Sequence, residues 1–199
     1  MLETYCRPFL QRNFVDPLAA LLATRKISPL HITFLSGVAG LAFFIALICG
    51  HITLSCALLV LSGYFDILDG SVARLRGLSS PLGTVLDIIT DRLVEFMAVL
   101  GLFCLEPGER GLLCLLMIGS MLLCVTSFLV VGIFSANTSD KSFHYSPGLM
   151  ERAEAFAFFI AMLLLPGYFR GLALSFVLLV TLTAVLRVMQ FARQEDELA

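Results

Sequence analysis

Apolar residues gather in long runs along the chain, and short polar breaks separate these runs. A transmembrane helix needs about 20 mostly apolar residues. Six stretches meet that requirement: 32–50, 54–73, 82–105, 112–134, 153–169 and 172–191. The pattern therefore predicts an all-α integral membrane protein with six transmembrane helices.

The segment before the first run is mixed in polarity. From residue 4 to residue 24, apolar side chains recur at helical spacing, and charged residues such as Arg12 and Asp16 stand between them. This pattern predicts an amphipathic interfacial helix that lies at the membrane surface. An amphipathic helix that only packs against other helices would have the same pattern.

The composition is that of a membrane protein. Hydrophobic residues make up 59% of the 199 residues and charged residues 14%, against about 45–50% and about 25% in soluble proteins. The formal net charge of -2 offers no basic surface for a nucleic acid. The six cysteines lie in or beside apolar runs without metal-ligand spacing, so we expect free thiols.

The distribution of basic residues predicts the orientation. Six spans place both termini on one side of the membrane, and that side collects most of the lysines and arginines, whereas the opposite loops hold only Arg110 and Arg170. By the positive-inside rule, both termini face the cytoplasm. We expect one multi-pass domain, residues 1–199, in the cytoplasmic membrane.

Charged residues interrupt the second and third predicted spans. They are Asp66, Asp69, Asp87, Asp91, Arg92 and Glu95. Facing lipid, each charge would be unfavourable by a few kcal/mol or more. The first two aspartates are three residues apart and the next two are four apart, so each pair shares one face of its helix.

A polar turn over residues 75–81 joins these two spans and predicts an antiparallel hairpin. Counted from position 78, Asp69 lies 9 residues before the bend and Asp87 9 after it, while Asp66 lies 12 before and Asp91 13 after. The acids therefore lie at matched depths, roughly one to two turns inside the cytoplasmic end. Four converging carboxylates would repel one another unless divalent cations neutralise them.

Oxygen ligands favour Mg²⁺ or Mn²⁺, and shared carboxylates suit a site with two metal ions that promotes displacement at phosphorus. The acids therefore predict phosphoryl-type transfer. Structural ion pairing competes with this prediction, because Arg74, Arg76 and Arg92 could pair with the acids. An ion-coupled transporter competes as well, since it also places acids within the membrane, although we find no inverted repeat here.

The chain carries a long motif, Asp66-x2-Asp69-Gly70-x2-Ala73-Arg74-x8-Gly83-x3-Asp87-x3-Asp91. This string resembles the signature of the CDP-alcohol phosphotransferases, and all eight signature positions match. The stretch that ends at Thr33 is similar to the Pro-Asn-x-x-Thr entry into the first span of that family.

The resemblance implies a transferase that moves a substituted phosphate from a CDP-activated donor to an alcohol and releases CMP. It implies that the four aspartates hold two ions, Mg²⁺ or Mn²⁺, and that Asp91 is also the general base. It further implies a CDP-binding set, with Arg74 on the diphosphate: Asp66, Asp69, Gly70, Ala73, Arg74, Gly83 and Thr33. The donor adopted from the family is CDP-diacylglycerol, a membrane lipid, and a homodimer is expected.

The acceptor alcohol is predicted from weaker signals. Lys141, Arg152 and Arg187 could surround an acceptor that itself carries phosphate, although ordinary membrane anchoring would also explain the first two. The spacing of Asp91, Arg92 and Glu95 is similar to that in members that use inositol phosphate. Glycerol 3-phosphate is the commonest bacterial acceptor in the family, so we expect it, giving phosphatidylglycerophosphate, with inositol phosphate and serine as alternatives.

Three further hypotheses stay open. A member that uses CDP-choline or CDP-ethanolamine would share the signature, although such members are larger. A catalytically silent scaffold would bind without turnover, and an ion-coupled transporter would move solute without consuming CDP-lipid.

Overall fold

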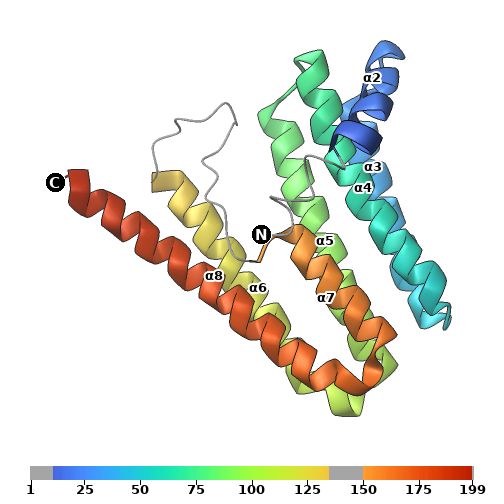
Figure 1. The fold of residues 1–199 in the computed structure, drawn as a ribbon, viewed down its shortest axis with the longest axis vertical. Coiled ribbons are helices and arrows are strands. Elements are labelled where there is room, and N and C mark those ends of the chain that lie inside the picture. Colours follow the sequence, from blue (N-terminus) through green and yellow to red (C-terminus); the bar gives the residue numbers. More distant parts are fainter. Residues whose placement is uncertain (1–10, 135–149, 199) are drawn as a thin grey trace. The chain divides into compact units, whose positions relative to one another are not determined.

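The computed structural model describes residues 11–134 and 150–198 (Figure 1). These residues form helices and contain no strand. The chain divides into two compact units, Met1–Leu105 and Glu106–Ala199. The five cysteines within the described ranges are free thiols, and Cys6 lies outside these ranges.

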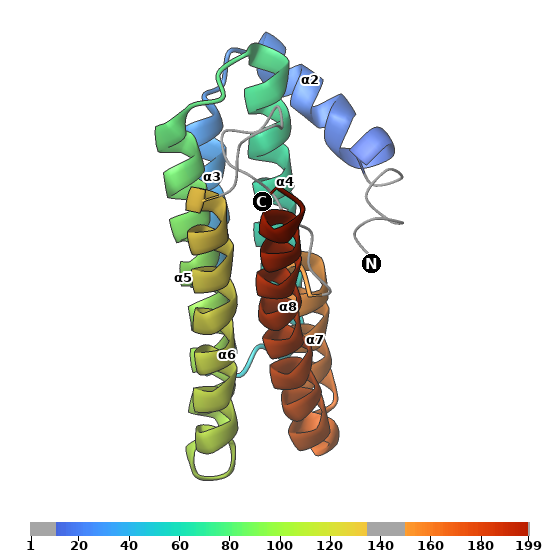
Figure 2. The same cartoon turned by 90° about the vertical axis from the view of Figure 1, so that its left-hand side faces the viewer.

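The first unit is built around one central helix. Its elements are the π-helix η1 (Gln11–Val15), α2 (Asp16–Thr24), α3 (Pro29–Ile48), α4 (Ile52–Arg76) and α5 (Pro81–Leu105). Helix α3 packs against both α4 and α5, and α2 packs on α4 (Figure 2). The predicted turn after α4 is present, with Gly77 in the left-handed region at φ 60°. Helices α4 and α5 are held mainly by α3 rather than by each other.

Small residues let α3 approach its neighbours closely. A Cβ atom at Gly40 would lie 2.4 Å from Val94 Cγ2 of α5, and one at Gly101 would lie 2.6 Å from Leu47 Cδ2 of α3. On the other side, Ser36 Oγ donates to the Ser62 carbonyl of α4 at 2.9 Å, and Ser62 Oγ donates to the Ser36 carbonyl at 2.9 Å. These contacts set the distance of α4 and α5 from α3.

Replacing Gly40 with alanine should destabilise the first unit. The added methyl group would overlap the buried Val94 side chain, and overpacking of this kind costs about 1–3 kcal/mol. The melting temperature in detergent should fall by several degrees. Gly119→Ala is the matched control, since a Cβ there meets nothing within 4 Å. A Gly40→Ala melting temperature equal to that of the control would contradict this packing.

The segment before α3 packs one face on α4 and exposes the other. Val15 and Ala19 are buried in a cluster with three residues of α3 and α4, namely Ile32, Leu68 and Val72. Phe14 and Leu21 are exposed. The predicted helix over 4–24 is seen as two pieces, because Pro17 lacks an N–H and the turn before it widens into η1; residues 4–10 lie outside the described ranges.

The second unit consists of α6 (Pro107–Phe134), α7 (Arg152–Leu164), the 3₁₀ helix η2 (Pro166–Tyr168) and α8 (Phe169–Leu198). Helix α8 packs against both α6 and α7. Near the starts of α6 and α8, the Arg110 guanidinium carbon lies 4.5 Å from the centroid of the Phe169 ring. Further along, Arg187 of α8 donates to the Cys124 carbonyl of α6. Helices α6 and α8 therefore run parallel.

Three boundary predictions in this unit are wrong. The span predicted over 153–169 ends at Leu164, because Pro166 pushes Leu165 out of the helical region to φ -124° and ψ 62°, and α8 begins at Phe169 rather than at residue 172. Arg110 is not in a loop. Pro107 starts α6 before it, and Arg110 is buried with its Nε 3.2 Å from Glu106 Oε2.

The length and hydropathy of the helices are those of a membrane protein. Four stretches among the described residues are long and apolar enough to cross a bilayer: Pro29–Ile48, Ile52–Arg76, Pro107–Phe134 and Pro166–Arg193. Helix α5 has 25 residues but carries the charges of the third predicted span, and α7 has 13 residues. Length and composition thus support four of the six predicted spans directly.

Candidate active site

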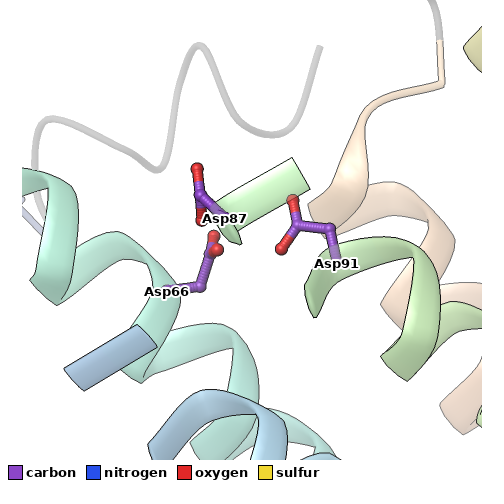
Figure 3. Close-up of side chains that lie close together, drawn as sticks. All are labelled: Asp66, Asp87 and Asp91. Atoms are coloured by element: carbon purple, nitrogen blue, oxygen red, sulfur yellow. The ribbon is translucent and has the colours of Figure 1, made fainter. Parts of the chain in front are cut away.

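Three acidic side chains of the first unit converge on one point. One carboxylate oxygen from each of Asp66, Asp87 and Asp91 lies within 4.8 Å of the others. Asp66 comes from α4, the other two come from α5, and the three carboxylates point toward one another (Figure 3). All three residues are half-buried.

The register of α4 and α5 explains this convergence. Asp66 lies ten residues before the last residue of α4, Arg76, and Asp91 lies ten residues after the first residue of α5, Pro81. At a rise of about 1.5 Å per residue, both are about 15 Å from the turn, and Asp87 is about 9 Å from it. Asp66 and Asp91 thus lie at matched distances from the turn, as the sequence predicts, but these distances are about three helical turns rather than one to two.

Asp69 takes a different position from the other three aspartates. It is buried, and its Oδ2 accepts a hydrogen bond of 2.5 Å from the Thr33 hydroxyl of α3. Three residues along a helix correspond to a rotation of about 300°, so its side chain is turned about 60° from that of Asp66. Among the described residues, the carboxylates that converge within 4.8 Å are those of Asp66, Asp87 and Asp91.

The converging group fits a divalent cation by its chemistry. Its ligand atoms are all oxygen, which is the donor that Mg²⁺ and Mn²⁺ prefer. Oxygens on opposite sides of Mg²⁺ lie about 4.2 Å apart, since each bond is about 2.1 Å. The observed spread of up to 4.8 Å therefore needs only a small adjustment. A cation would also relieve the repulsion between the carboxylates.

The arginines near the acids have distinct partners. Arg74 NH2 donates to Ser71 Oγ at 3.1 Å, and a Cβ at Gly70 would lie 3.4 Å from Arg74 NH1. Arg76 NH1 donates to the Ile27 carbonyl at 2.7 Å, while Arg92 pairs with the buried Glu95 at 2.6 Å. Arg74 is exposed at the end of α4, where it could reach a ligand.

Small residues border the acids at the ends of both helices. Ser80 precedes Pro81 and caps α5, because its Oγ accepts the Gly83 N–H at 3.1 Å. A Cβ at Gly83 would lie 3.2 Å from that oxygen, so a larger residue would crowd the cap. Ala73, on α4, is half-buried. Gly83 therefore places a residue without a side chain one turn before Asp87.

The basic residues predicted to bind the acceptor belong to the second unit. Arg187 is buried and donates through NH1 to the Cys124 carbonyl at 3.0 Å and to Ser127 Oγ at 3.1 Å. The Met150 N–H donates to Thr183 Oγ1 at 3.0 Å, one turn before Arg187. Arg152, two residues after Met150, begins α7, so both arginines lie in the same part of the unit. Lys141 lies outside the described residues.

The signature, the helical fold and the acidic group define the class of protein. The chain belongs to the CDP-alcohol phosphatidyltransferase family, whose model matches residues 26–190.

Individual relatives point to one branch of that family. The chain is 30% identical over 146 residues to a phosphatidylinositol phosphate synthase of Corynebacterium glutamicum, a match that covers 70% of this chain and 64% of that protein. It is 31% identical over 155 residues to an archaetidylinositol phosphate synthase of Methanothermobacter thermautotrophicus, covering 78% and 73% of the two chains. These names favour inositol phosphate over the glycerol 3-phosphate that we expected first.

Solved structures share the fold. The phosphatidylinositol phosphate synthase of Mycobacterium tuberculosis with CDP-DAG bound superposes with a TM-score of 0.68 at 19% identity, covering 90% of this chain and 92% of that one. The same enzyme in complex with manganese and citrate gives a TM-score of 0.72, also at 19% identity, covering 89% and 88%.

Proposed function

We propose that this protein is a phosphatidyltransferase that moves the phosphatidyl group of CDP-diacylglycerol to inositol phosphate and releases CMP. The observation that carries the proposal is the convergence of Asp66, Asp87 and Asp91 within 4.8 Å in a chain of this family. The proposed acceptor is supported by the inositol phosphate synthases among its relatives.

We assign the metal ions to the acidic group. Asp66, Asp87 and Asp91 would hold Mg²⁺ or Mn²⁺, and Asp69 would join them in binding a pair of ions once its bond to Thr33 is exchanged. Bound there, the ions would neutralise negative charge on the diphosphate of the donor. Manganese in the complex of the Mycobacterium tuberculosis enzyme supports this choice of ion.

The remaining groups would bind and orient the substrates. The acceptor hydroxyl needs a base within hydrogen-bond reach, and Asp91 would take its proton as the oxygen bonds to the phosphorus that bears the diacylglycerol. The bond from that phosphorus to the bridging oxygen breaks, and CMP leaves. Arg74 would neutralise the leaving phosphate through its planar guanidinium. Gly70, Ala73, Gly83 and Thr33 would line the CDP pocket.

Arg152 and Arg187, together with Lys141, would bind the phosphate of the acceptor. The buried position of Arg187 supports its part in this proposal, because a guanidinium withdrawn from water interacts more strongly with a phosphate than an exposed one does. Serine, the other alternative acceptor, carries no phosphate for these residues.

We also propose that α5 and α7 complete six membrane spans, with both termini and the acids on the cytoplasmic side. In this arrangement the acids of α5 face a ligand rather than lipid. A site about 15 Å from the turn suits a reaction between a donor that arrives from the bilayer and an acceptor that arrives from water.

The test is CMP release by the purified protein with CDP-diacylglycerol and Mn²⁺ or Mg²⁺, with inositol phosphate, glycerol 3-phosphate and serine supplied separately. Release should require inositol phosphate and should stop when EDTA removes the ions. Release with another of these alcohols would reassign the acceptor. If no alcohol supports release while the metal-loaded protein is folded, the scaffold and transporter hypotheses gain support.

A further inference from the structure

The segment before α3 reaches the arginine assigned to the diphosphate through one buried hydroxyl. Ser71 is 3% exposed and lies on α4 between Gly70 and Arg74, at a variable position of the signature. Gln11 of η1 lies 60 residues away in the sequence, yet its Nε2 is 3.0 Å from Ser71 Oγ.

The hydroxyl of Ser71 has its full set of partners. It donates its single hydrogen to the Ile67 carbonyl, one turn back, at 2.9 Å. Its two lone pairs accept from Gln11 Nε2 at 3.0 Å and from Arg74 NH2 at 3.1 Å. Because the donated hydrogen points to Ile67, the lone pairs are oriented toward the two donors. Ser71 therefore holds one end of an arginine that is otherwise exposed.

Gln11 is itself held in place. Its Nε2 also donates to Asp16 Oδ1, the first residue of α2, at 2.6 Å. The Tyr64 hydroxyl of α4 donates to the Phe14 carbonyl of η1 at 2.8 Å, and Val15 is buried against α4. The position of Gln11 thus depends on the packing of η1 and α2 on α4.

We infer that Ser71 is a positioning residue that aims the Arg74 guanidinium at the diphosphate of the donor, and that Gln11 fixes the Ser71 hydroxyl when η1 and α2 pack on α4. The inference rests on the proposed function, since it assumes that Arg74 binds the diphosphate. It assigns to the segment before α3 a part in donor use in addition to the contact with the membrane surface that its sequence predicts. Arg74 itself remains the residue that touches the substrate.

A double-mutant cycle tests this coupling. Ser71→Ala should lower kcat/KM for CDP-diacylglycerol by about three- to tenfold, the effect of losing one ordinary hydrogen bond, because the exposed guanidinium can replace it with water. The KM for inositol phosphate should stay unchanged, and the variant should remain folded at the assay temperature even with a melting temperature a few degrees lower. In an Arg74→Ala background, Ser71→Ala should have no further effect on kcat/KM, because the guanidinium that it positions is gone.

Gln11→Ala provides an independent variant. It should lower kcat/KM for the donor by less than Ser71→Ala does. Asn13→Ala, which changes an exposed residue of the same π-helix, should leave kcat/KM unchanged. The inference is overturned if Ser71→Ala lowers kcat/KM equally with and without Arg74, or if Gln11→Ala matches the Asn13 control.

These measurements separate a failure of the proposed function from a failure of the positioning role of Ser71. If wild-type protein releases no CMP, the proposed function has failed before any variant is made. If Arg74→Ala is as active as an active wild type, Arg74 does not bind the diphosphate, and the positioning role of Ser71 is then wrong as well.

Discussion

Asp91→Asn should reduce turnover by about 10²- to 10⁴-fold, the usual contribution of a positioned general base. Asparagine retains a carbonyl oxygen in the group with Asp66 and Asp87 but cannot accept the proton of the acceptor hydroxyl. The variant should therefore still bind CDP-diacylglycerol in the presence of Mn²⁺. CMP release and binding of the donor to the detergent-purified protein are the two measurements.

Glu109→Gln is the control for the Asp91 variant. It makes the same change from carboxylate to amide at a residue whose side chain is 71% exposed, in a surface ion pair with Arg170. Pairs of this kind contribute little, so its turnover should match the wild type. Near-normal turnover of Asp91→Asn would remove Asp91 from the role of base. Loss of both donor binding and turnover would show that the metal-ligand role dominates.

Arg187→Ala should raise the KM for inositol phosphate by about ten- to a hundredfold, as expected for the loss of hydrogen bonds from a charged group to a phosphate. The KM for CDP-diacylglycerol should change little, because Arg187 is assigned to the acceptor alone. Steady-state kinetics with each substrate varied in turn would measure both values.

Two further variants separate binding from packing at this position. Arg187 also donates to Cys124 and Ser127 of α6, so its loss could loosen the contact between α6 and α8. Arg187→Lys keeps the charge but loses the planar fork, and it should fall between alanine and wild type. Arg170→Ala removes an exposed charge from the same helix and should leave both KM values unchanged. An unchanged acceptor KM in Arg187→Ala would exclude Arg187 from the acceptor site.

The helices were predictable where a local signal exists. The turn between α4 and α5 contains Gly77, which adopts the left-handed conformation that ends α4. The apolar stretches of α3, α4 and α6 are long enough to cross a membrane. The boundaries near Pro166 and Pro107 were missed because hydropathy ignores how proline acts on the backbone. Pro166 ends the preceding helix at Leu164, and Pro107 starts α6 in a stretch predicted as a loop.

The acids were predictable because their signature is local. Asp66, Asp69, Asp87 and Asp91 stand at fixed spacings across one turn, so helix geometry alone predicts their depth and the face that each pair shares. Asp69 differs from the other three for a reason that its own helix does not contain. Its partner is Thr33 on α3, and no spacing within α4 reveals which residue of another helix will donate to it.

The identity of the acceptor alcohol could not be predicted from this sequence alone. Glycerol 3-phosphate was expected from its frequency in the family, while the similarity of Asp91, Arg92 and Glu95 to inositol phosphate users pointed the other way. The relatives favour the second. Arg92 and Glu95 form an ion pair at 2.6 Å, so the motif also has a structural role within α5.

The membrane class, most of the helical elements and the four acids can be predicted from the amino-acid sequence, because hydropathy, helix period and residue spacing act along one stretch of chain. The folded chain was needed to show that α3 lies against both α4 and α5, that three acids converge while Thr33 binds the fourth, and that Gln11 reaches Ser71. Each of these depends on the packing of side chains from distant segments, where the close approach at Gly40 and Gly101 sets the geometry.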